Sequence, residues 1–227
     1  MKQLFLILTC AVGLAASQGA SAQYSSGQGP AAGDWEFRIG PIFMNSQTVD
    51  FKGGSNATVK SNTGIKGGAG YYLNDNLVLG GNFAYSKADF SGNVANGTTP
   101  GTVSFEGGRL EFSSLMFDAT YNFLQGPFRP FVEGGLGWSW INTNIATGPP
   151  QVGCWWDPWW GYVCNGYQPT KSNSSFAYQL GAGLQFNFSR EFGLSASYKK
   201  TWIDMKNSST APGFDGFELM FNWRFPG

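Results

Sequence analysis

An alternation of apolar and polar residues recurs in eight separate segments of this chain, and it limits the possible folds more than any other feature. Successive side chains of a β-strand point to opposite faces, so a period of two predicts a strand with one apolar and one polar face. In the last segment, every second residue from Phe217 to Phe225 is large and apolar. The eight segments are 34–46, 63–73, 77–90, 105–123, 130–142, 175–188, 194–202 and 217–225. The chain is therefore predicted to be all-β.

The connections between these segments alternate in length. Short turns are predicted near 74–76, 125–128 and 189–192. Longer polar stretches lie at 47–62, 91–104, 143–174 and 206–213. An even number of strands with short turns at one end and long loops at the other is typical of an antiparallel up-and-down barrel in an outer membrane, with the N-terminus on the periplasmic side.

The environment of the apolar face separates two kinds of barrel. A soluble lipocalin-like barrel places large apolar residues inside and charged residues outside. Here 20 Phe, 9 Trp and 9 Tyr would overfill the narrow interior of eight strands, and only 12% of the residues are charged. The opposite faces carry mainly small and polar residues, which suit that interior. We therefore predict an eight-stranded antiparallel up-and-down transmembrane β-barrel.

The chain divides into a leader, a short linker and the barrel. Residues 1–22 combine Lys2, an apolar run and the small-residue triplet Ala20–Ala22, which is typical of a secretory signal peptide. Residues 23–33 are rich in Gly, Ser and Gln and are expected to be a flexible periplasmic lead-in, and 34–227 form the barrel. Cys154 and Cys164 remain after signal removal, and in an oxidising compartment we expect them to form a disulfide.

Composition excludes several classes of function. Fourteen basic and fourteen acidic residues give no net charge, so a nucleic-acid partner is not expected. The chain has no histidine, which removes Ser-His-Asp triads and His-rich metal sites. No catalytic, cofactor-binding or metal-binding residue is assigned, and the protein is predicted not to be an enzyme.

Charged residues on the polar faces balance one another. Four acidic and four basic side chains are predicted to form a charge network in the lumen: Glu36, Arg38, Lys66, Asp118, Glu133, Lys199, Glu218 and Arg224. Glu36 and Arg224 lie at the same end of the first and last strands, which must be neighbours in a closed barrel, so a pair across this seam is expected. Such balance favours side chains that satisfy one another in a plugged lumen. A gated conduit is the alternative interpretation.

The segment between the two cysteines is dense in aromatic residues. Candidate contact residues in it are Trp155, Trp156, Trp159, Trp160 and Tyr162. Trp and Tyr dominate interface hot spots, which favours a surface contact site. The alternative is that these rings pack on one another, or on the membrane interface, and only cap the barrel. The sequence does not decide between the two, and the surface ligand is unknown.

The leader, the eight alternating strands and the aromatic last strand together resemble the small outer-membrane β-barrel proteins of Gram-negative bacteria, the OmpA, OmpX and opacity type. The resemblance implies a location in the bacterial outer membrane, contact with its lipid and lipopolysaccharide, and recognition of Trp223–Arg224–Phe225 by the barrel-assembly machinery. This chain adds Pro226 and Gly227 after that signal.

The resemblance also frames the function. The first hypothesis is a non-enzymatic protein for envelope integrity or surface interaction. The alternative is transport of small or hydrophobic solutes, either porin-like or like the OmpW group, whose use of hydrophobic solutes implies an apolar lumen. The polar, charge-paired lumen predicted here favours the first hypothesis.

Overall fold

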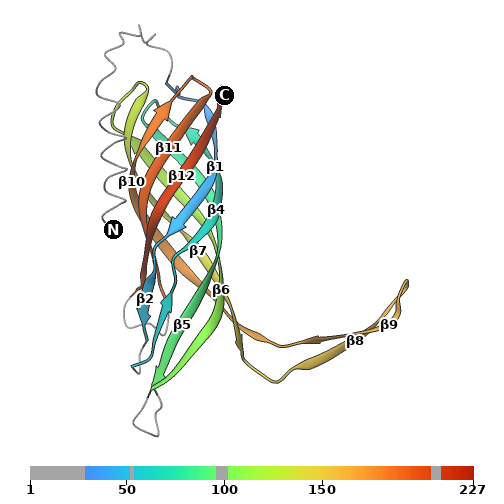
Figure 1. The fold of residues 1–227 in the computed structure, drawn as a ribbon. Coiled ribbons are helices and arrows are strands. Elements are labelled where there is room, and N and C mark those ends of the chain that lie inside the picture. Colours follow the sequence, from blue (N-terminus) through green and yellow to red (C-terminus); the bar gives the residue numbers. More distant parts are fainter. Residues whose placement is uncertain (1–28, 52–53, 96–101, 206–210) are drawn as a thin grey trace.

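Eight long antiparallel strands close into a barrel (Figure 1). The computed structural model describes residues 29–51, 54–95, 102–205 and 211–227. The barrel strands are β1 (Trp35–Met44), β4 (Asn62–Tyr72), β5 (Leu77–Ala95), β6 (Thr102–Asn122), β7 (Phe128–Ala146), β10 (Thr170–Asn187), β11 (Phe192–Ile203) and β12 (Gly213–Phe225). Their order around the ring follows the chain, with β1 paired to both β4 and β12. The predicted eight-stranded up-and-down barrel is confirmed.

The seam between the first and last strands closes the ring. Trp35 lies opposite Phe225 and Glu36 opposite Arg224. A Cβ atom at Gly40 would lie 1.9 Å from the carbonyl oxygen of Leu219, so only glycine fits where the backbone of β12 approaches β1 this closely. Closure satisfies the backbone N–H and C=O groups that would otherwise be exposed along two sheet edges.

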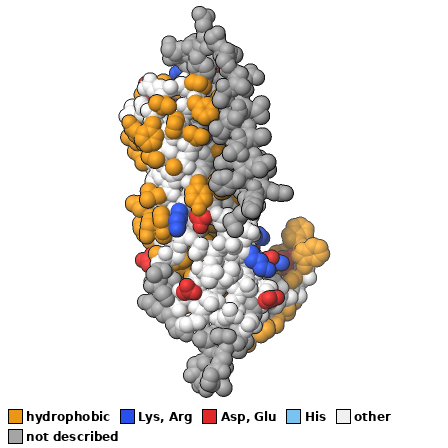
Figure 2. Space-filling model, turned by 60° about the vertical axis from the view of Figure 1, so that its left-hand side comes forward, with side chains coloured by type: hydrophobic (Ala, Val, Ile, Leu, Met, Phe, Trp, Pro, Cys, Tyr) orange, Lys and Arg blue, Asp and Glu red, His pale blue; other side chains and the backbone are white. Residues whose placement is uncertain are grey.

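The two faces of the wall differ as predicted. On β1, Phe37 is 49% exposed on the outside whereas its neighbour Glu36 is 3% exposed inside. The same alternation continues through β12, where Phe221 points outward and Asn222 is buried. Figure 2 shows hydrophobic side chains over the upper part of the wall and charged side chains mainly below them. The upper part is the end of the barrel with the short turns, called here the turn end; the opposite end is the loop end.

The strands continue further toward the loop end than the alternation of large outward residues predicted. Short strands β2 (Gln47–Asp50) and β3 (Asn56–Val59) form a hairpin within the stretch expected to be a polar loop, and β3 pairs with the end of β5. A separate two-stranded sheet, β8 (Gln151–Asp157) and β9 (Gly161–Tyr167), occupies the middle of the stretch 143–174. These strands were not predicted, because their outward residues are polar and the prediction relied on large apolar outward residues.

The N-terminal segment meets the turn end of the barrel. The predicted signal peptide and residues 23–28 of the lead-in lie outside the described residues. Within the described part of the lead-in, the backbone N–H of Gly33 donates to the carbonyl of Tyr72 at 2.8 Å, and that of Ala32 donates to Oδ1 of Asp75 at 3.1 Å. No helix in the described part of the chain is long and apolar enough to cross a membrane.

Candidate functional site

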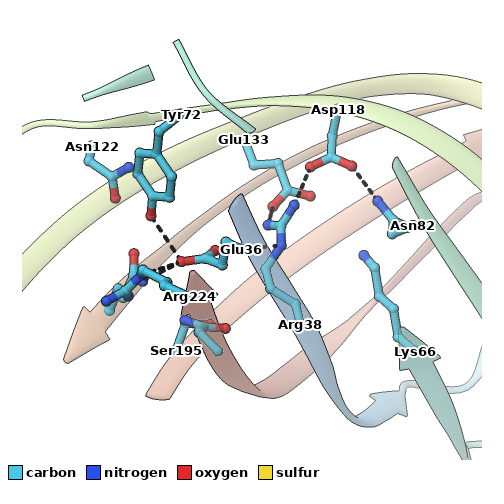
Figure 3. A network of polar contacts seen from close by, with 12 residues as sticks. Glu36, Arg38, Lys66, Tyr72, Asn82, Asp118, Asn122, Glu133, Ser195 and Arg224 are labelled. Atoms are coloured by element: carbon cyan, nitrogen blue, oxygen red, sulfur yellow. Dashed lines mark hydrogen bonds and ion pairs between the residues drawn. The ribbon is translucent and has the colours of Figure 1, made fainter. Parts of the chain in front are cut away.

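The predicted cross-seam pair anchors one end of the lumen network (Figure 3). Nε of Arg224 donates to Oε2 of Glu36 at 2.7 Å, which joins β12 to β1. The same oxygen accepts from the hydroxyl of Tyr72 at 2.9 Å and from Nε2 of Gln185 at 3.3 Å. Arg224 also donates from Nη2 to Oδ1 of Asn187 at 2.5 Å. Donors from three other strands therefore fix one buried carboxylate.

Arg38 lies at the centre of the network and contacts three carboxylates. Its Nη2 donates to Oδ2 of Asp118 at 3.0 Å, its Nη1 lies 3.6 Å from Oε2 of Glu133, and its Nε lies 3.8 Å from Oε1 of Glu36. Nδ2 of Asn82 donates to the other oxygen of Asp118 at 2.5 Å. Arg38 therefore connects the seam pair to the far side of the lumen, as Figure 3 shows.

Two lysines continue the network toward the loop end. Nζ of Lys66 donates to Oε1 of Glu218 at 3.1 Å, and Nζ of Lys199 lies 2.9 Å from Oε2 of the same carboxylate. Lys199 is also hydrogen-bonded to Glu133. All eight predicted lumen residues are thus brought together, and each lies within ion-pair distance of an opposite charge.

The continuity of this network explains how so many charges can be buried. Removing a charge from water costs several kcal/mol, and only close opposite charges with further hydrogen bonds offset that cost. Glu36, Glu133 and Arg224 are each at most 3% exposed, and all three are paired. The ion-paired layer, as we call these eight residues, therefore places balanced and mutually paired charge in the lumen.

Sequence reasoning missed a cap beside this layer. Arg129 is 1% exposed; its Nε donates to the carbonyl of Leu124 at 3.2 Å, and its Nη2 donates to the carbonyl of Asp75. Its guanidinium carbon lies 5.8 Å from the ring centre of Tyr72. Arg129 lies an even number of residues from Glu133, and Tyr72 an even number from Lys66, both of which were predicted to face the lumen. The alternation therefore places Arg129 and Tyr72 inside as well. The signal was available, but the predicted segment began after Arg129.

The loop-end half of the lumen is apolar, which corrects the prediction of a uniformly polar interior. Inward side chains there form a buried cluster of Phe112, Met116, Ile141, Ala177 and Ile203. A second cluster contains Val59, Ala88 and Phe90. Phe112 has the inward parity of Asp118, and Ile141 that of Glu133, so extending the same alternation would have identified them. A cavity of about 500 Å³ is lined by Phe112 and Ile141 of the first cluster and by Val59 and Phe90 of the second.

The hairpin of β8 and β9, called here the aromatic hairpin, projects away from the barrel (Figure 1). Cys154 and Cys164 lie opposite each other in its ladder and are disulfide-bonded, as predicted. Oδ1 of Asp157 accepts from the backbone N–H groups of Trp159 at 2.8 Å and Trp160 at 3.0 Å, which fixes the turn. The predicted contact residues range from 50% exposed at Trp155 to 90% at Trp159.

This arrangement bears on the two interpretations of the aromatic segment. The hairpin forms its own sheet and does not cover the end of the barrel in Figure 1. Its rings are therefore presented outward, whereas a cap would bury them against the strands. Trp156, Trp160 and Tyr162 are 70%, 83% and 71% exposed.

The sequence matches, over residues 6–225, the family described as outer membrane protein beta-barrel domain. A relative named "Putative adhesin RC1281" from Rickettsia conorii is 29% identical over 199 residues, covering 80% of this chain and 72% of the relative.

Solved structures show the same fold at low identity. The outer membrane protein OprG of Pseudomonas aeruginosa has a TM-score of 0.55 and 16% identity, over 88% of this chain and 99% of OprG. Neisserial surface protein A has a TM-score of 0.50 and 15% identity, over 87% of this chain and 99% of its own.

Proposed function

The chain belongs to the outer membrane protein β-barrel domain family, and on that premise we propose that it is a non-enzymatic outer-membrane protein that contacts other cell surfaces through its aromatic hairpin. One observation carries the proposal. Trp159 and Trp160, 90% and 83% exposed, stand at the tip of a hairpin that projects away from the barrel. Large apolar side chains exposed together are unusual unless they bind something.

The chemistry of the hairpin supports a contact made by rings. Within residues 151–167, Asp157 is the one ionisable side chain that carries charge at neutral pH, and its carboxylate already accepts two backbone hydrogen bonds in the turn. Tryptophan and tyrosine contribute large contact areas and dominate hot spots in protein interfaces. Binding through this surface should therefore depend little on salt, because no charged group needs to be neutralised.

The disulfide supports the same function by ordering the hairpin before any partner arrives. The disulfide joins β8 to β9 close to the turn. Cys154 lies three residues before Asp157, and Cys164 lies three residues after Gly161. A surface that is already ordered loses less conformational entropy on binding, which raises affinity without additional contacts. The name of the Rickettsia conorii relative, an adhesin, also agrees with a contact function.

The barrel itself serves the envelope in this proposal. Its outward residues contact lipid and, on the outer side of the membrane, lipopolysaccharide, while the ion-paired layer holds the strands together from within. Recognition of the last strand by the barrel-assembly machinery rests on Trp223–Arg224–Phe225 and stays a prediction. Transport is the alternative function, and the apolar loop-end half of the lumen favours entry of a hydrophobic solute. The ion-paired layer argues against passage beyond it.

Adherence of whole cells tests the proposed contact function. Bacteria that express the protein should adhere to monolayers of cultured epithelial cells, and Trp159→Ala with Trp160→Ala should reduce adherence at least about tenfold, as expected for two hot-spot side chains. Val152→Ala is the matched control, since it shortens a 72% exposed apolar side chain on the same hairpin away from the tip. The amount of protein at the surface should be equal for all variants.

Two results would contradict the proposal. One is equal adherence of the tip variant and the native protein at equal surface amounts. The other is adherence that both variants lose alike, which would indicate a general effect on the hairpin and not a contact through its tip.

A further inference from the structure

The cavity in the loop-end half of the lumen is partly open, and strands from around the barrel line it. Its walls include Phe90 of β5, Leu110 and Phe112 of β6, Ile141 of β7 and Phe214 of β12. Its volume of about 500 Å³ falls within the range of roughly 300–1,000 Å³ typical of small-molecule sites. The cavity therefore has the size of a binding site for a single small molecule.

The ion-paired layer lies next to this cavity, on the side toward the turn end of the barrel. A smaller space lined by Lys66, Lys199 and Glu218 shares Met44, Phe112 and Phe214 with the cavity wall. These three charged residues are already paired with one another or with Glu133. A molecule entering from the loop end would therefore meet apolar walls first and then a layer that offers it no free charge.

The chemistry of the lining is uneven. The inner walls are mostly aromatic and aliphatic, so water would find few hydrogen-bond partners whereas a hydrocarbon chain would gain contacts. Toward the loop end the lining becomes polar, with Asn93, Thr143 and Ser172. Lys171 is the one charged side chain among the residues that line the cavity; it is exposed, and it forms no ion pair with any residue that the structure describes.

We propose that this cavity binds a long-chain fatty acid, with the hydrocarbon chain inside the barrel and the carboxylate at Lys171. The apolar walls match the chain, and the ammonium of Lys171 matches the opposite charge of the headgroup. The ion-paired layer limits how deep the chain can extend. This site is separate from the aromatic hairpin, so it does not depend on the contact function.

Binding is measured on the protein in lipid nanodiscs by displacement of the fluorescent fatty acid cis-parinarate. Palmitate and hexadecanol serve as competitors that share a chain and differ in the headgroup. Ala57 lines the cavity and is half-buried, and Ala57→Phe should weaken both competitors at least about tenfold by filling the space. Lys171→Gln should weaken palmitate about three- to fivefold, the value of an exposed ion pair, and leave hexadecanol unchanged.

Matched controls separate the cavity from the lipid-facing wall. Ala119→Phe adds the same ring on the outward face, and Lys200→Gln removes an exposed ammonium outside the cavity; both should bind like the native protein. Leu110→Trp is a second filling change if Ala57→Phe does not give a heat-modifiable barrel. Trp159→Ala with Trp160→Ala should also bind normally.

Three outcomes would overturn the proposal. If neither competitor displaces cis-parinarate from the native protein, the cavity does not bind such chains. Equal binding by Ala57→Phe and Ala119→Phe would mean that the probe partitions onto the lipid-facing surface. If Lys171→Gln weakens palmitate and hexadecanol alike, or neither, the assignment of the carboxylate to Lys171 is wrong.

Discussion

Apolar and polar residues alternate at both ends of the barrel, but the apolar face points outward at the turn end and inward at the loop end. Strand β5 shows both arrangements. Toward the turn end, Leu79 and Phe83 are about half exposed on the outside, and Asn82 between them is buried. Toward the loop end, Lys87 and Asp89 point outward and Phe90 is buried. The backbone is the same, so the medium outside the wall decides which face is apolar. The turn-end half fits a bilayer, and the loop-end half fits water.

The largest expected effect comes from opening one buried pair in the turn-end half. Arg224→Ala leaves the carboxylate of Glu36 buried without its closest cation, and should lower the free energy of unfolding by about 3–5 kcal/mol. Urea unfolding in phospholipid vesicles, followed by tryptophan fluorescence, measures the change. The matched variant in the loop-end half is Lys87→Ala, which opens the exposed 2.7 Å pair with Glu111 and should leave stability unchanged.

The double variant Glu36→Gln with Arg224→Met sharpens this test. It removes both charges and should be more stable than Arg224→Ala, because no uncompensated charge stays buried. Equal losses from the Lys87 and Arg224 variants would show that the exposed pair outside the wall contributes as much stability as the buried pair in the lumen, and would contradict the difference between the two regions.

A charge on the outer wall should produce a somewhat smaller effect. Leu180 is 59% exposed on the outward face of β10, and Leu180→Arg should cost about 2–4 kcal/mol if that face contacts the middle of a bilayer. Asn142→Arg, outward on the loop-end part of β7, is the matched control and should cost nothing measurable. A soluble barrel would tolerate both arginines equally.

The smallest effect on the barrel is expected from the aromatic hairpin. Cys154→Ser with Cys164→Ser should leave the heat-modifiable migration of the barrel unchanged, because the disulfide lies outside the closed ladder of the wall. The hairpin itself should open more easily, by about 2–3 kcal/mol, so chymotrypsin should cleave there faster. Loss of the barrel in this variant, or two free thiols in the native protein by mass spectrometry, would contradict the assignment of an independent hairpin.

Much of this organisation follows from the sequence alone. Parity placed Glu36 and Arg38 inside and Phe37 outside, and a closed ring required the first and last strands to meet, which predicted the Glu36–Arg224 pair. The Cys154–Cys164 disulfide followed from the expected oxidising compartment.

The missing parts have a common physical reason. The segments were identified by large apolar residues on one fixed face, and that rule holds only where the wall contacts lipid. Where the polarity reverses, Phe112 and Ile141 become inward residues, and the strand ends beyond them, such as 91–95 and 143–146, were interpreted as polar loops. The cavity could not be predicted, because its volume depends on how side chains from many strands meet and not on any local pattern.

The seam between β1 and β12 also constrains how the protein can be made. Glu36 and Arg224, which bond across it, are separated by 188 residues. Contacts so distant along the chain form late and slowly, since a long loop must be closed before they contribute. Until β12 is in place, β1 and β11 are open edges that can pair with any other strand. The nascent polypeptide must therefore be kept apart from other chains until its last strand has been synthesised and paired. A chain shortened by β12 would have two unpaired strand edges, on β1 and β11, in place of a closed barrel.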